Sequence, residues 1–168
     1  MKARKAWPAI TVAVLFSVAC SGGERAADAE SQEWSLDQRS WHLGAIAAMS
    51  EMVDYGVKKL ALGAPLAPDE MDVFIDDAIR TAGKHNVEIY RENDFLVTDL
   101  FSAELTEGKH VLLICHESTF HEYEALKAEK KRLEALGEYH GEARTDIARR
   151  FGKLLSYPDA HIELELTQ

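Results

Sequence analysis

Apolar residues recur along this chain with the two periods that distinguish helices from strands. The clearest helical period runs through six positions spaced one turn apart, namely Met71, Phe74, Ile75, Ala78, Ile79 and Ala82. This pattern predicts an amphipathic helix, with Asp69 as its N-cap after a loop marked by Pro65 and Pro68. Three further helices are expected: one from a capping box at Ser35 and Gln38 to Gly56, one from a capping box at Thr119 and Glu122 to Gly137, and one over residues 141–155.

Strands are expected where short apolar or alternating runs occur. Residues 111–115 form an unbroken apolar run, which is typical of a buried central strand. Residues 87–91 alternate, and residues 95–98 can pair back on them as a hairpin, with a short helical turn after it near residues 99–105. Residues 162–166 alternate strictly and predict an edge strand with two glutamates facing outward.

The segment 57–62 is ambiguous, because so short a run fits both periods. Val53, Val57 and Leu60 keep helical spacing, and residues 60–62 contain no β-branched residue, which favours continuation of the first helix. The alternative is a short strand over residues 59–62.

These elements predict the α+β class: a single domain over residues 34–168, with one small mixed β-sheet and about four amphipathic helices packed on it. The chain has 168 residues, of which 46% are hydrophobic and 29% are charged, so one domain can bury a substantial core. The net charge of −10 argues against nucleic acid as a partner, because phosphate binding requires a surplus of lysine and arginine.

The first 20 residues have the pattern of a targeting segment. Three positive charges precede an uncharged apolar run over residues 9–19, which is too short to span a bilayer; the charges are on Lys2, Arg4 and Lys5. The run ends in Val18, Ala19 and Cys20, followed by Ser21. This segment resembles the signal peptide of a bacterial lipoprotein.

The resemblance implies a processing route and a location. Residues 1–19 would be removed, Cys20 would be lipidated, and residues 20–33 would form a flexible tether. The membrane would then be a partner through the N-terminal lipid anchor, and the domain would lie in the cell envelope, facing the periplasm. Ser21 resembles the residue that directs such proteins to the outer membrane. The alternatives are a secretory signal cut near Ala19, which would give a secreted or soluble periplasmic protein, and an uncleaved anchor.

Candidate chemistry concentrates just after the apolar run 111–115. Two His-Glu pairs, at residues 116–117 and 121–122, form the densest group of possible ligands: His116, Glu117, His121 and Glu122. All four are candidate catalytic residues, with Glu92 or Asp94 as possible helpers, and His116, His121 and Glu122 are candidate metal ligands. In the structural alternative, Glu122 caps a helix, Glu117 complements its N-terminus, and both histidines are partly exposed.

Cys115 has two interpretations. Within an apolar run it is typical of a small core residue, and the alternative is a reactive or ligating thiol.

Two function classes follow from these observations. The first is an envelope-located, lipid-anchored α+β domain that binds a small ligand or a protein partner. The alternative is a metal-assisted hydrolase, or another envelope enzyme, that uses the cluster at residues 116–122. A third hypothesis, a structural subunit of an envelope complex, predicts an exposed apolar patch near Trp34 and Trp41. No phosphate-binding loop, CxxC pair or GxSxG motif is present, so no cofactor is indicated.

Overall fold

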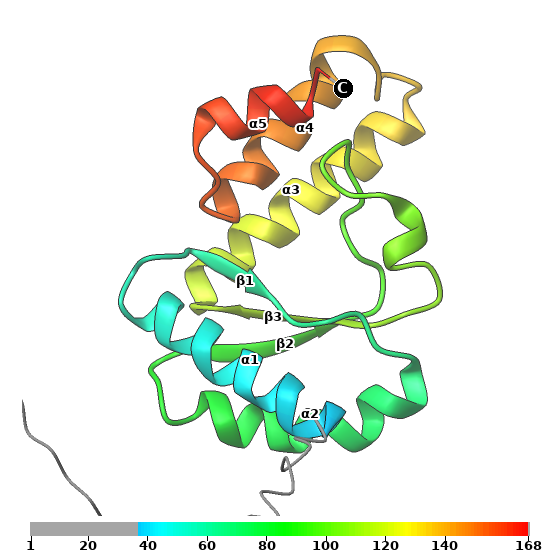
Figure 1. Cartoon of the computed structure of the whole chain (residues 1–168). Helices are drawn as coiled ribbons and strands as arrows, with labels where there is room; N and C mark the ends of the chain where they lie inside the picture. The colour runs from blue at the N-terminus through cyan, green and yellow to red at the C-terminus, as the bar shows by residue number, and fades with distance from the viewer. Residues whose placement is uncertain (1–36, 168) are drawn as a thin grey trace, which may run out of the picture. The chain divides into compact units, whose positions relative to one another are not determined.

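A computed structural model describes residues 37–167 of the chain. The described residues form one α+β domain in which a sheet lies between two layers of helices (Figure 1), as the sequence predicted. One layer consists of α1 (Gln38–Asp54) and α2 (Pro68–Ala82), and the other of α3 (Glu117–Ala135), α4 (Gly141–Leu154) and α5 (Asp159–Glu165). The expected signal peptide, the lipidated Cys20 and the tether lie outside the described residues. Within residues 37–167, no helix combines the length and the apolar character needed to cross a membrane.

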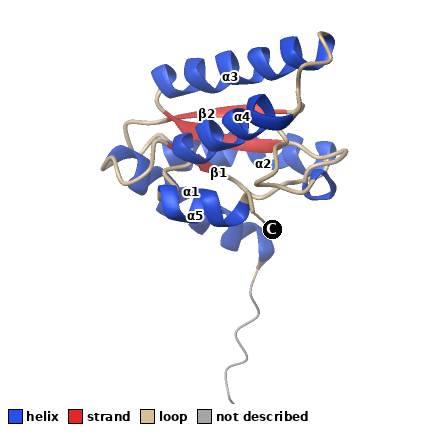
Figure 2. Cartoon of the chain, turned by 90° about the horizontal axis from the view of Figure 1, so that it is seen from above, coloured by secondary structure: helices blue, strands red, loops and turns tan. Residues whose placement is uncertain are grey.

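The sheet has three strands: β1 (Leu60–Leu62), β2 (Glu88–Glu92) and β3 (Val111–Cys115). Their order is β1-β3-β2, so the apolar run 111–115 is the central strand, as expected. Ile114 pairs with Ala61 on one side and with Ile89 on the other. Both pairings are antiparallel, so the parallel pairing that a mixed sheet requires is not found among the described residues. In Figure 2, α4 is drawn in front of these strands, whereas α3 and α5 lie on either side of them.

The side chains of β3 alternate between two separate hydrophobic cores. Leu112 and Ile114 belong to the core under α1 and α2, together with Ile46, Val53, Ala61, Met71, Phe74 and Ala78. Leu113 and Cys115 belong to the core under α3 and α4, together with Leu60, Leu96, Tyr123, Leu126, Ile147 and Phe151. All five residues of β3 are buried, because both faces of the strand are covered.

The segment 57–62 contains a strand, so the expected continuation of the first helix is wrong. Gly56 adopts a left-handed φ of +70°, and its N–H bonds to the carbonyl of Val53. Such a glycine terminates a helix, because it turns the chain away from the helical path. The chain then pairs with β3, where Gly63 N–H donates to the Leu112 carbonyl at 2.8 Å.

The hairpin expected at residues 95–98 does not form. Leu96 N–H donates instead to the hydroxyl of Tyr123 on α3 at 3.0 Å. A buried ion pair between Glu92 and Lys127, 2.9 Å apart, ties the end of β2 to the same helix. The chain after β2 is therefore held by α3 rather than by β2. The short helical turn expected near residues 99–105 is present as a 3-10 turn over Ala103–Leu105.

The strand expected at residues 162–166 is wrong, because residues 162–165 belong to helix α5 and Leu166 is its C-cap. Ile162 is fully buried, whereas Leu164 is 58% exposed, so the second apolar position does not share the inner face. Gly152 on α4 explains the docking of this helix. A Cβ atom at Gly152 would lie 2.8 Å from Ile162 Cγ1, so the missing side chain provides the space for close contact.

Two helix starts differ from those expected. Helix α2 begins at Pro68 with Ala67 as its N-cap, and the Glu70 carboxylate accepts the Ala67 N–H at 3.0 Å, so Asp69 is not the cap. Proline suits the first helical position because that position needs no N–H. Helix α1 begins after Asp37, which accepts from Ser40 N–H at 3.0 Å, and the expected cap at Ser35 lies outside the described residues.

Candidate functional site

Helix α3, which carries most of the histidine-glutamate cluster, begins earlier than the sequence suggested. His116 is the N-cap of α3, and its carbonyl accepts the N–H groups of Thr119 and Phe120 at 2.9 and 3.0 Å. The expected capping box at Thr119 and Glu122 is therefore wrong. The Thr119 side chain faces the interior instead, and the residue is only 7% exposed.

The earlier start puts Glu117 and His121 one turn apart on the same helix. His121 Nε2 lies 3.8 Å from Glu117 Oε1, and both side chains are more than two-thirds exposed. An ion pair this open to solvent is screened and contributes little. Among the described residues, no third ligand of the kind that a metal site requires joins these two groups.

Glu122 lies at a different place on the protein surface. It lines a hollow between α3 and α4 together with Lys59, Arg150 and Lys153. Across residues 37–167, no group of three or more His, Cys, Asp or Glu side chains is arranged to hold a metal ion. The structure thus does not bring the four candidate residues together.

The two possible helpers have other partners. Glu92 accepts a hydrogen bond from Asp94 N–H at 2.7 Å in addition to its ion pair with Lys127. Asp94 accepts from Lys131 at 2.5 Å, and this hydrogen bond lowers the pKa of the Asp94 carboxyl. Both carboxylates therefore secure the connection after β2.

Cys115 is a core thiol. It is fully buried on β3, and burial raises its pKa to about 12. A thiol in that state is protonated at neutral pH and is a poor nucleophile or metal ligand.

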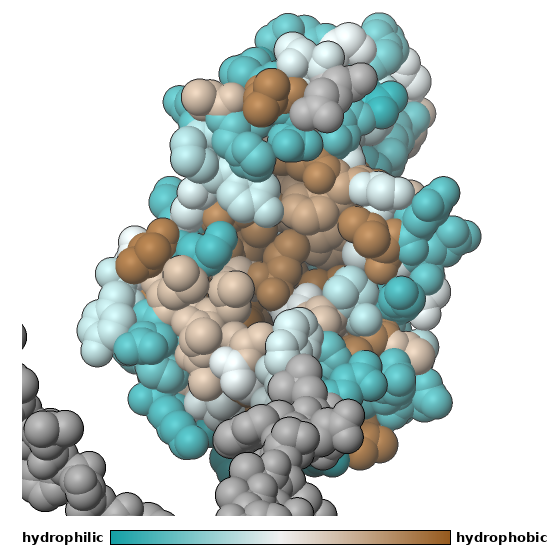
Figure 3. All heavy atoms as spheres, in the orientation of Figure 1, coloured by the Kyte–Doolittle hydropathy of each residue, from teal (hydrophilic) through white to brown (hydrophobic). Residues whose placement is uncertain are grey.

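A recess with a largely apolar wall lies between α1 and the connection from β1 to α2. It has a volume of about 300 Å³. Apolar side chains and glycine form most of its wall, which consists of Trp41, His42, Ala45, Ile46, Met49, Leu62, Gly63, Ala64, Leu66, Phe74 and Leu112. Brown and tan side chains gather beside α1 and toward the α3–α5 layer, where this face is hollowed (Figure 3).

A second, more open hollow adjoins this recess. It has a volume of about 480 Å³ and shares three wall residues with the recess, His42, Leu66 and Phe74. Its remaining wall is mostly polar and comes from the first turns of α1 and α2: Gln38, Arg39, Asp69, Glu70 and Val73. The two hollows together, called here the α1–α2 cleft, have an apolar inner end and a polar outer end.

His42 stands at the junction of the two hollows. Its ring packs edge-on against Trp41 and Phe74, with centroid distances of 5.0 and 6.0 Å. Its Nε2 atom is buried and has no hydrogen-bond partner among residues 37–167. An unpaired buried polar atom costs about 1–3 kcal/mol, so it is unusual in a site with a purely structural role.

The charged side chains at the outer end of the cleft differ in whether they have an oppositely charged partner. Arg39 is paired with Asp77 on α2, and their hydrogen bond raises the pKa of Arg39 and lowers that of Asp77. Glu70 accepts only the Ala67 N–H noted above, and neither Asp69 nor Glu70 has an ion-pair partner within the described part of the chain.

Sequence reasoning missed this cleft, although one signal for it was present. Helix α1 has apolar residues on more than its buried face, since Trp41, Ala45 and Met49 follow one another at one-turn spacing beside the buried Ile46. Trp41 is 52% exposed, in agreement with an apolar surface near this residue. Trp34, the other residue named for that patch, lies outside the described residues.

Similarity to known proteins adds no guide to function beyond the sequence and the geometry of the described residues. Comparison with protein-family models, with curated proteins and with solved structures finds no match for this chain.

Proposed function

We propose that this chain is a lipid-anchored protein of the bacterial cell envelope whose domain binds a small, largely apolar molecule in the α1–α2 cleft. The observation that carries the proposal is the apolar recess of about 300 Å³ that continues into a wider hollow with a polar wall. Ligand sites are typically concave, mostly apolar, and supplied with a few polar groups that orient the ligand.

The dimensions of the cleft favour a small molecule over a protein partner. The recess is at the lower end of the range of about 300–1,000 Å³ that is usual for ligand sites. Its walls come from α1, from the β1–α2 connection and from β3, so an inserted group would be surrounded on several sides. A protein partner would instead require a broader apolar face of about 800 Å² on each side.

The anchor in this proposal rests on the N-terminal sequence. The Cys20 thiol would carry the lipid, and the acidic domain, which gains no attraction from an anionic membrane surface, would depend on that lipid for attachment. Replacement of Cys20 by serine should release the protein from membranes and abolish incorporation of a labelled fatty acid. Retention of the Cys20→Ser variant in the membrane fraction would favour the uncleaved anchor instead.

Binding can be tested with the full chain carrying Cys20→Ser, so that no attached lipid competes for the cleft. The probes are n-alkanols from pentanol to decanol, followed by saturation-transfer NMR and titration. Each buried methylene contributes about 0.8 kcal/mol, so affinity should rise about fourfold per carbon and then level off when the recess is full.

A matched pair of variants locates the binding. Ala45 lines the recess, whereas Ala48 lies one turn away on the exposed side of α1. Ala45→Phe should fill the recess, so that affinity no longer rises with the length of the alkanol. Ala48→Phe should leave this dependence unchanged. The proposal is wrong if no alkanol binds, or if both variants bind like the parent chain.

A further inference from the structure

We infer that the ligand of the α1–α2 cleft carries a positive charge, so that its chemical class is an amphiphilic amine or ammonium compound. This inference rests on the proposed function and adds the nature of the polar end. The apolar part of the molecule would occupy the recess, and the cationic group would lie in the outer hollow beside Asp69 and Glu70.

The lining charges leave the outer hollow negative. Arg39 is the single cationic side chain among its described wall residues, and Asp77 already neutralises it from outside the wall. Asp77 in turn is shared with Arg80, which is three-quarters exposed and does not line the hollow. The remaining charges on the wall are the two carboxylates of Asp69 and Glu70.

A structural explanation for these two carboxylates accounts for only part of their charge. Acidic residues in the first turn of a helix complement its dipole, and Asp69 and Glu70 lie in the first turn of α2. That dipole corresponds to about half a positive elementary charge, whereas the two carboxylates bring two negative charges. The excess at the mouth of the cleft remains negative, and a cation is the group that it attracts.

Aromatic rings at the junction add a second feature that suits a cation. Phe74 and His42 separate the outer hollow from the recess, and Trp41 packs against His42. The face of an aromatic ring such as that of Phe74, which lines the outer hollow, attracts cations within about 6 Å. A molecule with an apolar tail and an ammonium group would therefore match the cleft along its whole length.

The test compares three ligands with the same tail and different polar ends: octyltrimethylammonium, octanol and octanoate. The protein is the full chain carrying Cys20→Ser at pH 7.5, and affinities come from titrations followed by NMR. Two carboxylates roughly 6 Å from a charge in water should favour the ammonium compound over the carboxylate by at least about tenfold, with octanol between them. The preference should weaken between 20 mM and 500 mM salt, because added ions screen exposed charges.

Variants show whether the preference comes from the two carboxylates. The double variant Asp69→Asn, Glu70→Gln removes both charges, and the glutamine keeps an oxygen that can accept the Ala67 N–H. It should bind the three ligands with nearly equal affinity and bind octanol like the parent chain. Asp76→Asn is the control, since Asp76 is an exposed acid on the same helix outside the wall of the hollow.

The possible outcomes separate the two proposals. Equal affinities for the three ligands, or tighter binding of octanoate, would overturn the cationic ligand class and leave the apolar site standing. Loss of the charge preference with Asp76→Asn as well would assign it to the general acidity of the protein and would also overturn the inference. If none of the ligands binds, the proposed function itself fails.

Discussion

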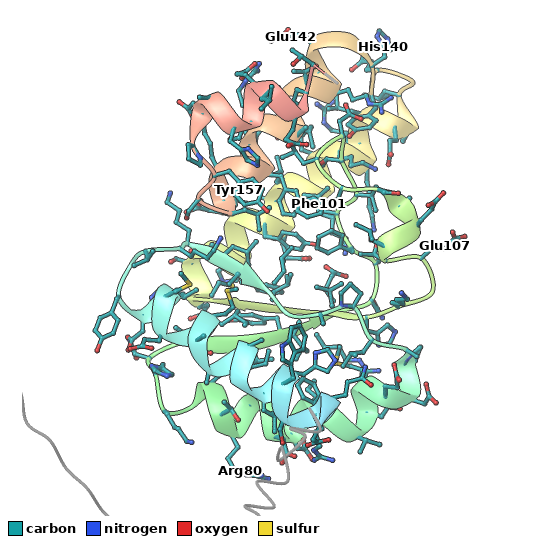
Figure 4. All side chains as sticks on the ribbon, viewed as in Figure 1. Arg80, Phe101, Glu107, His140, Glu142 and Tyr157 are labelled. Atoms are coloured by element: carbon teal, nitrogen blue, oxygen red, sulfur yellow. The ribbon has the colours of Figure 1, made fainter. Side chains whose placement is uncertain are left out.

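The two faces of strand β3 are packed in opposite ways. On the α3–α5 side, Leu113 and Cys115 face an aromatic core in which the rings of Phe95, Phe101, Tyr123 and Phe151 meet at centroid distances of 5.7 to 6.0 Å. Phe101 and Tyr157 lie on this side of the sheet (Figure 4). On the α1–α2 side, Leu112 forms part of the wall of an open recess.

The difference shows how one small sheet can combine a filled core on one face with a recess on the other. A filled aromatic core gains contacts on every side of each ring, and a recess gives up such contacts along its wall. Strand β3 contributes side chains to both layers. Packing on the α3–α5 side can therefore hold the strand in place, while the recess on the α1–α2 side remains unfilled. We expect the free energy of unfolding to come mainly from the α3–α5 side and ligand binding from the other side.

The strongest test of this comparison truncates one phenylalanine on each side. Phe151 is fully buried and touches three other aromatic rings, so Phe151→Ala should lower the free energy of unfolding by about 3–5 kcal/mol. Phe74 is also buried, but it borders both hollows and already lacks contacts there. Phe74→Ala should therefore lose about half as much.

Urea unfolding of the full chain measures both losses, with the dependence on urea concentration showing whether the two variants unfold in the same manner. Equal losses would mean that the recess does not weaken its own side of the sheet. Phe74→Ala should in addition reduce alkanol binding, whereas a variant of Phe151 that remains folded should not.

The ionisation of Cys115 reports on the filled side, and within any one pH unit its effect is smaller than that of either truncation. With Cys20→Ser in place, Cys115 is the only thiol of the chain. Its pKa is raised from 9.0 to about 12 by burial, so between these pH values the folded protein keeps a proton that the unfolded chain releases. The contribution of this group to stability is complete below pH 9 and declines as the pH rises toward 12, by at most about 1.4 kcal/mol per pH unit.

The rate of thiol labelling at pH 8 measures the protection of Cys115 without the titration of other groups at strongly alkaline pH. Labelling of Cys115 should be slow in the folded protein and should accelerate in proportion to unfolding as urea is added. Rapid labelling without urea would show that the α3–α5 side opens locally, and the contrast between the two faces would then be wrong.

The smallest effect concerns the outer surface of the α3–α5 side. His121→Ala and Glu117→Ala remove the two members of an exposed pair, and each should change the free energy of unfolding by less than about 0.5 kcal/mol. Neither variant should alter binding in the α1–α2 cleft. A loss of metal content or of a chelator-dependent melting temperature in either variant would revive the metal-site hypothesis for this helix.

The fold was predictable where a long segment kept a single period. The helix now seen as α2 shows six apolar positions in helical spacing, and β3 is apolar without interruption, and both were placed correctly. Residues 162–166 were misassigned because five alternating residues also fit about one and a half turns of a helix with one apolar residue inward. Ile162 packs closely against Gly152 on α4, and such packing between two elements is not visible in a local pattern.

The candidate site could be predicted only in part. Residues 116–122 attracted attention because ligand-type side chains are adjacent in sequence, but a helix start three residues before Thr119 directs them to separate places. The cleft arises from three segments that are distant in the chain, around His42, around residues 62–74 and at Leu112. Its volume depends on the spacing between elements, which apolar periodicity does not encode.

The position of β3 between β1 and β2 has a consequence for how the polypeptide reaches its native state. The central strand is the last of the three along the chain, so β1 and β2 have no neighbour to pair with until residues 111–115 are present. Any nascent chain shorter than this lacks a sheet, and both of its hydrophobic layers stay incomplete. Pairing of β1 with β3 joins residues that are far apart in the chain, and such non-local pairing slows folding. The chain therefore stays unfolded for longer after its synthesis.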